Sequence, residues 1–335
     1  MREIDVVIVG GSLAGAACAI ELGRRGIEAL AFERDRFPRR KVCGAFLSPG
    51  ALVVLRDLGV FDEIRARGAR RIGRVRLSAG STTHEFPLSE PGFGFSRWLL
   101  DSILAREARV FEGHSVERIQ DGGRGRRFLV DFRTGAGAPE RVACRMVVDA
   151  AGRFSRFTRR IPRSQFGVQF PESRDTGPVL EFGFFDWGYG GTVGVEDGGA
   201  NSCFLADRSM LGTFLRREDC AVVGAVAYAR RPGPYLAVGD ASGMIDPFSG
   251  EGMRHALESG RMAGEWVAEG FGRGWSYQTT RERYESAHDS RWAAKRRAGA
   301  ILRWWLRHPG MARRIGPCVR FPGLAGMLVE RLWAV

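Results

Sequence analysis

The sequence predicts an α/β fold in which a parallel-sheet domain carries an inserted antiparallel sheet and is followed by a helical C-terminal tail. Three observations support this prediction. A β-branched strand, a glycine-rich turn and a helix follow one another near the N-terminus, and a second strand–turn–helix unit lies near residue 240. Between them, residues 161–233 contain aromatic-rich runs typical of strands. With 335 residues, 44% of them hydrophobic, the chain can bury a core unaided.

The first unit begins with the predicted strand Ile4–Val9, whose β-branched residues suit a parallel strand buried on both faces. The turn Gly10–Gly15 follows, and then a predicted helix Ala16–Arg25 and a second strand Ile27–Phe32. A strand, a glycine turn, a helix and a strand in this order are typical of the Rossmann dinucleotide-binding unit.

Each residue type in this turn has a physical role. Gly10 permits a tight turn out of the strand, and Gly15 lets the helix pack closely on the sheet. Ser12 stands where a second glycine is usual, and serine is the smallest replacement that still permits close approach. Free N–H groups at the helix N-terminus favour a pyrophosphate. Glu33, at the end of the second strand, is placed to accept hydrogen bonds from adenosine ribose hydroxyls.

A longer motif covers residues 239–252, after the predicted strand Pro234–Val238 and before a predicted helix Met253–Glu269. It reads Gly-Asp-x-x-Gly-x-x-x-Pro-x-x-Gly-Glu-Gly and resembles the second flavin-binding motif of FAD-dependent oxidoreductases. The resemblance implies FAD as the cofactor, with Asp240 on the ribityl chain and the Gly250–Gly252 turn against the isoalloxazine ring. The helix that follows would direct its positive N-terminal end at the flavin and stabilise the anionic reduced form.

Two shorter stretches agree with this resemblance. Residues 96–104 are similar to the family pattern Arg-x-x-(Leu/Phe)-Asp-x-x-Leu, which implies that Arg97 faces the flavin; a surface arginine is the alternative. Residues 145–155 match the position of the Asp-Gly motif of flavin hydroxylases, but Ala151 replaces the motif's Asp. This replacement argues against direct reduction by NADPH.

The segment Pro38–Gly44 resembles the Pro-x-x-Lys-x-Cys-Gly segment of the geranylgeranyl reductase family, whose Cys lies beside the flavin. The resemblance implies that Cys43 lies at the reacting face, where its thiol could deliver a proton while the flavin delivers a hydride to a C=C bond. The alternative for Cys43 is a buried small hydrophobic residue. Lys41 has two possible roles: it either neutralises a phosphate or lies on the surface. After this segment a helix is predicted over Pro49–Leu58.

The middle of the chain departs from that family. Val179–Trp187 and Val193–Leu205 are predicted strands of a substrate-binding sheet. Archaeal-type geranylgeranyl reductases carry Tyr-x-Trp-x-Phe-Pro here, whereas this chain keeps only Tyr189. We predict substrate contacts for Trp187 and Tyr189 in a reshaped pocket for a hydrophobic small molecule. The segment Ala206–Arg231 is short for this family, which suggests a reduced substrate domain.

These interpretations define the expected site and domains. The predicted cofactor-binding residues are Gly10, Ser12, Ala14, Gly15, Glu33, Arg34, Lys41, Cys43, Gly44, Arg97, Gly239, Asp240, Pro247, Gly250, Glu251 and Gly252. The predicted FAD-binding domain is discontinuous and covers residues 1–75, 96–160 and 234–270. The substrate sheet is expected from residues 76–95 and 161–233, and a basic helical segment from residues 271–335.

Three functions are compatible with these motifs. The first is an FAD-dependent reductase of C=C bonds in an isoprenoid or polyketide-derived lipid, with Cys43 or water as the proton donor. The second is a flavin monooxygenase that hydroxylates an aromatic or lipid-quinol substrate, which the changed Asp-Gly motif disfavours; halogenation is disfavoured because Trp-x-Trp-x-Ile-Pro is absent. The third is a degenerate flavoprotein without catalysis. Because the chain has one dinucleotide fingerprint, an external reductant such as NADPH or ferredoxin would have to dock transiently.

The net charge of +13 is concentrated in the tail, since residues 291–335 contain ten Lys and Arg residues and one acidic residue, Glu330. Arginine and tryptophan interleave there on predicted short helices broken at Pro309, Pro317 and Pro322. Such a segment suits peripheral contact with an anionic membrane surface at the inner face of the membrane, or a helical cap over the substrate pocket. No nucleic-acid recognition fold accompanies the charge, so nucleic acid is not an expected partner.

Other classes of site and location are disfavoured. The six cysteines and five histidines are scattered without ligand spacing, so neither a metal site nor a disulfide framework is expected. The apolar run at the N-terminus is explained by the strand and glycine turn rather than by a signal peptide. We therefore expect a cytoplasmic protein.

Overall fold

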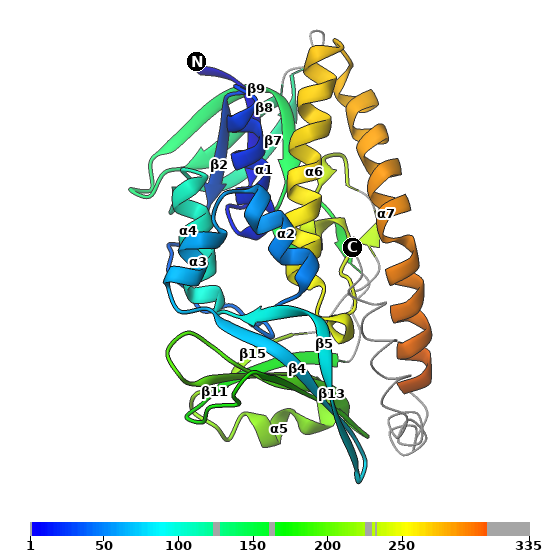
Figure 1. The fold of residues 1–335 in the computed structure, drawn as a ribbon. Coiled ribbons are helices and arrows are strands. Elements are labelled where there is room, and N and C mark those ends of the chain that lie inside the picture. Colours follow the sequence, from blue (N-terminus) through cyan, green and yellow to red (C-terminus); the bar gives the residue numbers. More distant parts are fainter. Residues whose placement is uncertain (1, 123–127, 161–164, 225–229, 232, 307–335) are drawn as a thin grey trace.

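Two β-sheets and the helices between them build the chain in the computed structural model (Figure 1). The structure describes residues 2–122, 128–160, 165–224, 230–231 and 233–306. In Figure 1 one sheet lies in the upper part of the molecule and the other at its lower end, and a long helix, α7, runs along one side. This arrangement confirms the predicted α/β fold with a second sheet and a helical C-terminal region.

The first sheet contains the two predicted strand–turn–helix units and has the strand order β6-β2-β1-β9-β8-β7, with β17 also paired to β9. Strands β6, β2, β1, β9 and β17 pair in parallel, whereas β9, β8 and β7 pair antiparallel. The strands are β1 (Arg2–Val9), β2 (Ala29–Glu33), β6 (Phe111–Glu112), β7 (Ser115–Asp121), β8 (Phe128–Arg133), β9 (Pro139–Asp149) and β17 (Leu236–Ala237).

The second sheet has eight strands in the order β15-β11-β14-β13-β12-β4-β5-β3. All its pairs are antiparallel except β12 with β4. The strands are β3 (Phe46–Leu47), β4 (Arg70–Ala79), β5 (Thr82–Gly94), β11 (Gln165–Glu172), β12 (Val179–Phe185), β13 (Gly188–Gly194), β14 (Ala200–Asp207) and β15 (Ala221–Val223). This sheet therefore takes residues 70–75 as well as the predicted range 76–95. A separate short pair joins β10 (Arg159–Arg160) to β16 (Arg230–Arg231).

The helices lie mostly around the first sheet and between the two sheets (Figure 1). They are α1 (Leu13–Arg24), α2 (Pro49–Asp57), α3 (Phe61–Ala66), α4 (Arg97–Glu107), α5 (Leu211–Phe214), α6 (Gly252–Gly272) and α7 (Tyr277–Leu306). Short 3₁₀ helices are η1 (Gly152–Phe154), η2 (Arg208–Met210), η3 (Gly239–Ser242) and η4 (Pro247–Ser249). None of the helices in the described part of the chain is long and apolar enough to cross a membrane.

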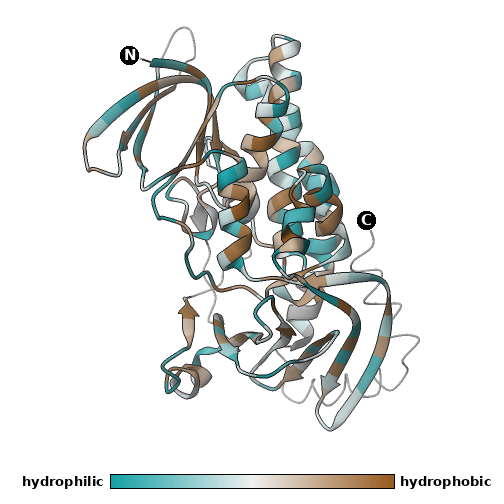
Figure 2. Cartoon of the chain, turned by 60° about the vertical axis from the view of Figure 1, so that its left-hand side comes forward, coloured by the Kyte–Doolittle hydropathy of each residue, from teal (hydrophilic) through white to brown (hydrophobic). Residues whose placement is uncertain are grey.

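Buried apolar residues on the first sheet pack against α1 and α6. Val6, Ile8 and Val148 are fully buried there, and Leu22 and Val267 contact them from the helices. Figure 2 shows hydrophobic residues along the strands of this sheet and mixed hydrophobic and hydrophilic residues along the helices, as expected for helices with one solvent face. The core therefore fixes the end of β1, where the first glycine turn begins.

Two predicted strands end earlier than the sequence indicates. The run Val193–Leu205 is not one strand, because β13 ends at Gly194 and β14 begins at Ala200. The Asp197 carboxylate accepts the Gly199 N–H at 3.0 Å, and Gly198 has a φ of +83°, so the chain turns there. The run Val179–Trp187 likewise ends at Phe185, which places Trp187 in the turn before β13.

The described part of the C-terminal segment is a single long helix. Residues 277–306 form one continuous helix, α7, which packs against α6. Pro309, Pro317 and Pro322 lie outside the described residues. Among the described side chains of residues 291–306 none lines the cavity described below, and the predicted cap over the pocket stays a prediction for the remainder of the segment.

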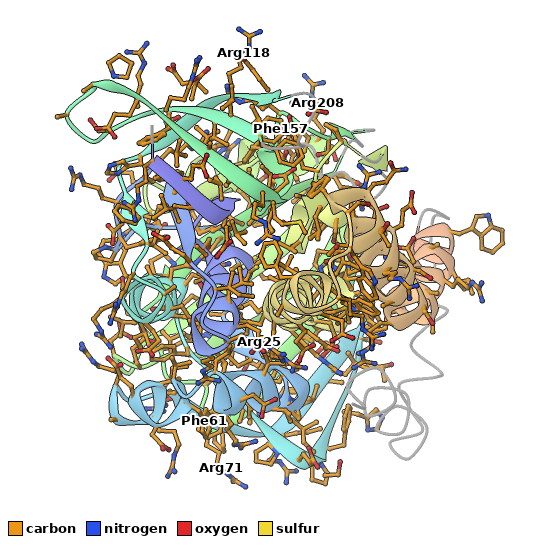
Figure 3. All side chains as sticks on the ribbon, turned by 90° about the horizontal axis from the view of Figure 1, so that it is seen from above. Arg25, Phe61, Arg71, Arg118, Phe157 and Arg208 are labelled. Carbon is orange, nitrogen blue, oxygen red and sulfur yellow. The ribbon has the colours of Figure 1, made fainter. Side chains whose placement is uncertain are left out.

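Much of the arginine excess lies on the surface. Figure 3 looks down on the molecule and shows Arg118 and Arg71 at opposite edges, both exposed. Many surface arginines pair with carboxylates of neighbouring strands, as Arg76 does with Glu85 at 2.8 Å. Such exposed pairs contribute little to stability.

Candidate functional site

The first glycine turn brings the backbone and the N-terminus of α1 to one end of the parallel sheet. Gly10 has a φ of +103°, and a Cβ atom there would lie 2.4 Å from the Ala150 carbonyl oxygen. A Cβ atom on Gly15 would lie 1.8 Å from the Gly10 carbonyl oxygen. Both positions therefore require glycine, and the free N–H groups of α1 remain open toward an anion.

Ser12 joins three charged side chains at this helix end. Its hydroxyl donates to Asp101 Oδ1 at 2.7 Å and accepts from Lys41 Nζ at 3.1 Å and from Arg97 Nη2 at 2.8 Å. Arg97 also holds Asp101 through two bonds of 3.0 and 2.8 Å. The serine that replaces the usual glycine thus anchors two cations beside the N-terminus of α1.

Burial changes the protonation of this cluster. It opposes ionisation of Asp101, but the charges of Arg97 and Lys41 outweigh it and hold the pKa of that carboxyl below its usual range. Burial, with repulsion from Arg97, lowers the pKa of Lys41 to about 8. Lys41 is therefore not a free surface lysine, and a bound anion would stabilise its charged form.

Cys43 lies at the junction of the two sheets. Its backbone N–H donates to Gln169 Oε1 at 3.0 Å, and its carbonyl accepts from Asn201 Nδ2 at 3.0 Å. Gln169 belongs to β11 and Asn201 to β14, so the second sheet holds this backbone segment. Burial opposes ionisation of Arg97, but the Asp101 carboxylate outweighs it and raises the pKa of the guanidinium, so Arg97 lines the same cavity as Cys43 in its charged form.

Glu33 ends β2 with its carboxylate buried at 5% exposure. One carboxylate oxygen accepts the Gly11 N–H at 3.2 Å and lies 3.6 Å from Arg39. The neighbouring Arg34 pairs with Asp35 at 3.7 Å and is mostly exposed. The acid is therefore placed at the end of the parallel strand, next to the glycine turn, as the sequence predicted for a ribose contact.

The second motif faces the first across the same cavity. Gly239 and Asp240 begin η3, and Arg153 approaches the Asp240 carboxylate at 3.6 Å. Pro247, Gly250 and Gly252 line the cavity, but Glu251 does not. The Glu251 side chain is fully buried and pairs with Arg254 at 3.1 Å and with Lys295 of α7.

These elements enclose a cavity of about 770 Å³. Among the residues predicted for the site, all line it except Gly15, Glu251 and Trp187. Trp187 instead stacks on Phe185 with ring centroids 4.6 Å apart. The predicted residues that line the cavity are Gly10, Ser12, Ala14, Glu33, Arg34, Lys41, Cys43, Gly44, Arg97, Tyr189, Gly239, Asp240, Pro247, Gly250 and Gly252.

One part of the cavity is apolar and is formed by the second sheet. Residues two apart on β4 and β12 point into it, and Phe248 from the second motif joins them; the apolar lining includes Val75, Leu77, Leu180, Phe182, Phe184 and Phe248. Apart from the aromatic strands, sequence reasoning missed this lining, although the alternation on β4 is a signal for it. It also missed Arg153, which directly follows the Asp-Ala-Ala-Gly stretch at 149–152.

The residues present fit FAD. The glycine-only turn at Gly10 leaves backbone space for a dinucleotide, and Lys41 and Arg97 supply cations beside the helix N-terminus for its pyrophosphate. Glu33 would hold the ribose, and Asp240 with the 250–252 turn would hold the flavin end. A ligand held there would leave the apolar part of the cavity for a substrate.

Comparisons with known proteins agree with this site. A family model described as an FAD binding domain matches residues 3–185, more than half of the chain. A menaquinone reductase from Mycobacterium tuberculosis is 28% identical over 340 residues, covering 81% of this chain and 81% of the relative. Digeranylgeranylglycerophospholipid reductase 3 from Methanosphaera stadtmanae is 24% identical over 314 residues, covering 80% of this chain and 78% of the relative.

Among solved structures, a flavin-dependent brominase superposes with a TM-score of 0.79 at 18% identity. The match covers 99% of this chain and 94% of the brominase chain. At this identity the likeness concerns the fold, which other flavin enzymes share, and does not define the reaction.

Proposed function

The chain belongs to the FAD binding domain family and is an FAD-dependent oxidoreductase; from this premise we propose that it reduces C=C bonds of a hydrophobic, prenylated substrate. The observation that carries the proposal is the position of Cys43. Cys43 lines the cavity together with Lys41 and Arg97, and its backbone is held by the second sheet, whose strands supply the apolar lining. A proton donor is needed beside the flavin and the substrate when a double bond is saturated.

Bound FAD, once reduced by an external donor, would supply the hydride in this chemistry. The Cys43 thiol would donate the proton to the other carbon of the double bond. The thiolate left behind would be stabilised by the Arg97 guanidinium, which lines the same cavity. Gln169 and Asn201 hold the Cys43 backbone and so keep the donor at the cavity wall.

The substrate class follows from the apolar lining and from the relatives. Phe182, Phe184 and Phe248 lie with ring centroids 5.5 to 5.7 Å apart and offer an aromatic wall to an apolar chain. The names of the two relatives, a menaquinone reductase and a digeranylgeranylglycerophospholipid reductase, denote reductases of lipids.

We propose that an external donor, such as NADPH or ferredoxin, delivers the electrons.

The test uses the FAD-loaded protein, reduced chemically without oxygen and mixed with a menaquinone that carries an unsaturated prenyl chain. After reoxidation of any quinol to the quinone, mass spectrometry should find the gain of two hydrogen atoms in the prenyl chain of the lipid. Cys43→Ala should retain FAD but lose most of this product, whereas Cys43→Ser should retain part of it. A product that gains an oxygen atom when air is admitted, with no product without oxygen, would overturn the reductase proposal in favour of hydroxylation.

We also propose that the outer end of α7 contacts an anionic lipid surface, where a prenylated substrate would be found. Ile301 is 62% exposed and Trp304 is 63% exposed, and both follow the basic residues of this helix. The tail from residue 291 carries ten basic residues and one acidic residue. Exposed apolar groups among cations suit the interface of an anionic membrane.

A further inference from the structure

The Glu251 carboxylate belongs to the flavin-binding turn but points toward α7. It is fully buried, and Oε2 accepts from Lys295 Nζ and from Arg254 Nη1, the latter at 3.1 Å. The other oxygen, Oε1, is buried without a hydrogen-bond partner in the described part of the chain. Lys295 is thus the α7 residue that compensates a buried charge within the 250–252 turn.

A second ion pair ties the same two helices together. Glu258, two turns further along α6, accepts from Arg254 at 3.0 Å and from Arg291 of α7 at 2.6 Å. Burial opposes ionisation of Glu258, but Arg291 and Arg254 outweigh it and lower the pKa of this carboxyl. The network therefore brings three cations, Lys295, Arg254 and Arg291, to two carboxylates, of which Glu258 is ionised at neutral pH.

An aromatic residue fills the space between these pairs. Trp292 is fully buried, its ring centroid lies 5.5 Å from Lys295 Nζ, and its ring meets that of His255 edge-on at 4.8 Å. The contact region is therefore packed rather than wet. In such surroundings, removal of one charge leaves its partner strongly uncompensated.

Lysine at position 295 is itself informative, because Lys41 and Lys295 are the only lysines in the sequence. Both lie at the flavin-binding motifs: Lys41 on Ser12 of the first, Lys295 on Glu251 of the second. A lysine ammonium is a compact point charge, whereas the arginine used elsewhere is a broad planar fork. The space beside Glu251 and Trp292 thus suits a lysine ammonium better than an arginine guanidinium.

We propose that Lys295 is a positioning residue that acts through Glu251: it holds the 250–252 turn and the N-terminus of α6 in the orientation that receives the flavin. Through this contact α7 controls how tightly the protein binds FAD and at what potential FAD is reduced. The inference rests on flavin binding and not on the proposed reaction, so it stands even if the substrate proposal fails.

The experiment compares Lys295→Met, Glu251→Gln and the double variant with wild type. FAD affinity is measured by fluorescence titration of the apoprotein, and the midpoint potential by anaerobic equilibration of the holoprotein with redox dyes. Lys295→Met should weaken FAD binding by about tenfold or more, because it removes one of the two cations paired with a buried carboxylate and leaves only Arg254. It should also shift the potential to more negative values, since the anionic reduced flavin is then disfavoured.

Glu251→Gln removes a negative charge and should shift the potential to more positive values, and the double variant should return toward wild type. Arg297→Met, at an exposed position on the same helix, is the matched control and should change neither quantity. Opposite shifts support the inference; equal shifts in the same direction, or wild-type values in both single variants, overturn it. If Lys295→Met does not fold, Glu251→Gln decides alone: a positive shift supports the inference, and no shift or a negative shift overturns it.

Discussion

The Tyr189 hydroxyl, on β13 of the second sheet, donates a hydrogen bond to the Asp246 carboxylate of the second motif. Both residues are almost fully buried, at 2% and 3% exposure. The same Asp246 oxygen accepts the Phe248 N–H at 3.0 Å. A single carboxylate thus fixes the aromatic wall of the cavity to the segment that leads into the flavin-binding turn.

Tyr189→Phe should destabilise the protein by about 1–3 kcal/mol, because it removes a donor from a buried carboxylate and keeps the ring. Thermal unfolding of the FAD-loaded protein measures this loss. The substrate KM should rise more than kcat falls, since Phe248 loses part of its support. An unchanged melting temperature would mean that water or another donor replaces the hydroxyl.

Lys41→Met should weaken FAD binding about tenfold or more at pH 7, because a charge-assisted contact beside the pyrophosphate is lost. The wild type should also show a pH effect. With a pKa of about 8 in the apoprotein, Lys41 loses its proton as the pH rises through 8, and FAD favours the protonated form. FAD affinity should therefore fall above pH 8.

The slope should approach about one decade of affinity per pH unit and disappear in Lys41→Met. Arg118→Met is a suitable control, because Arg118 lies exposed at the edge of the molecule (Figure 3). Isothermal titration of the apoprotein between pH 6 and 10 would measure both effects. A variant with the wild-type pH slope would assign the titration to another group.

Asp240→Ala should lose most of the bound FAD. Asp240 lines the cavity at η3 and is paired with Arg153 at 3.6 Å, so the variant removes a polar anchor and leaves a cation without its partner. The flavin-to-protein absorbance ratio after purification is the measurement, and Asp62→Ala on the exposed start of α3 is the control. Full flavin retention in Asp240→Ala would contradict the role of this motif residue.

Much of the site could be predicted because local sequence determines local backbone there. Gly10 requires a positive φ, and the residues of the two motifs follow strands whose ends meet at one edge of the sheet. For Ser12, the sequence showed only that a small residue was tolerated. Its bonds to Asp101, Arg97 and Lys41 join segments 29 to 89 residues apart, which no local pattern reports.

The errors have the same origin. Residues 193–205 were predicted as one strand, although Asp197 and the two glycines after it favour a turn. Glu251 was grouped with the cofactor by its motif, but its side chain direction depends on Lys295, 44 residues away. The sequence did not show where the helical tail packs, because its partners are Glu258 on α6 and Glu251 in the turn before that helix.

Deletion of residues 307–335 together with Ile301→Asp and Trp304→Asp should abolish binding to vesicles that contain anionic lipid, while the FAD content stays normal. The cut is placed after α7 because Trp292 is buried and Lys295 pairs with Glu251, so a cut at residue 291 would damage the flavin site itself. Vesicle co-sedimentation of the wild type should be strong at low salt and weaken as salt rises, since screening acts on the basic residues. Neutral vesicles provide the control. Absence of wild-type binding to anionic vesicles at low salt would contradict the membrane proposal and leave the basic tail as a solvated surface.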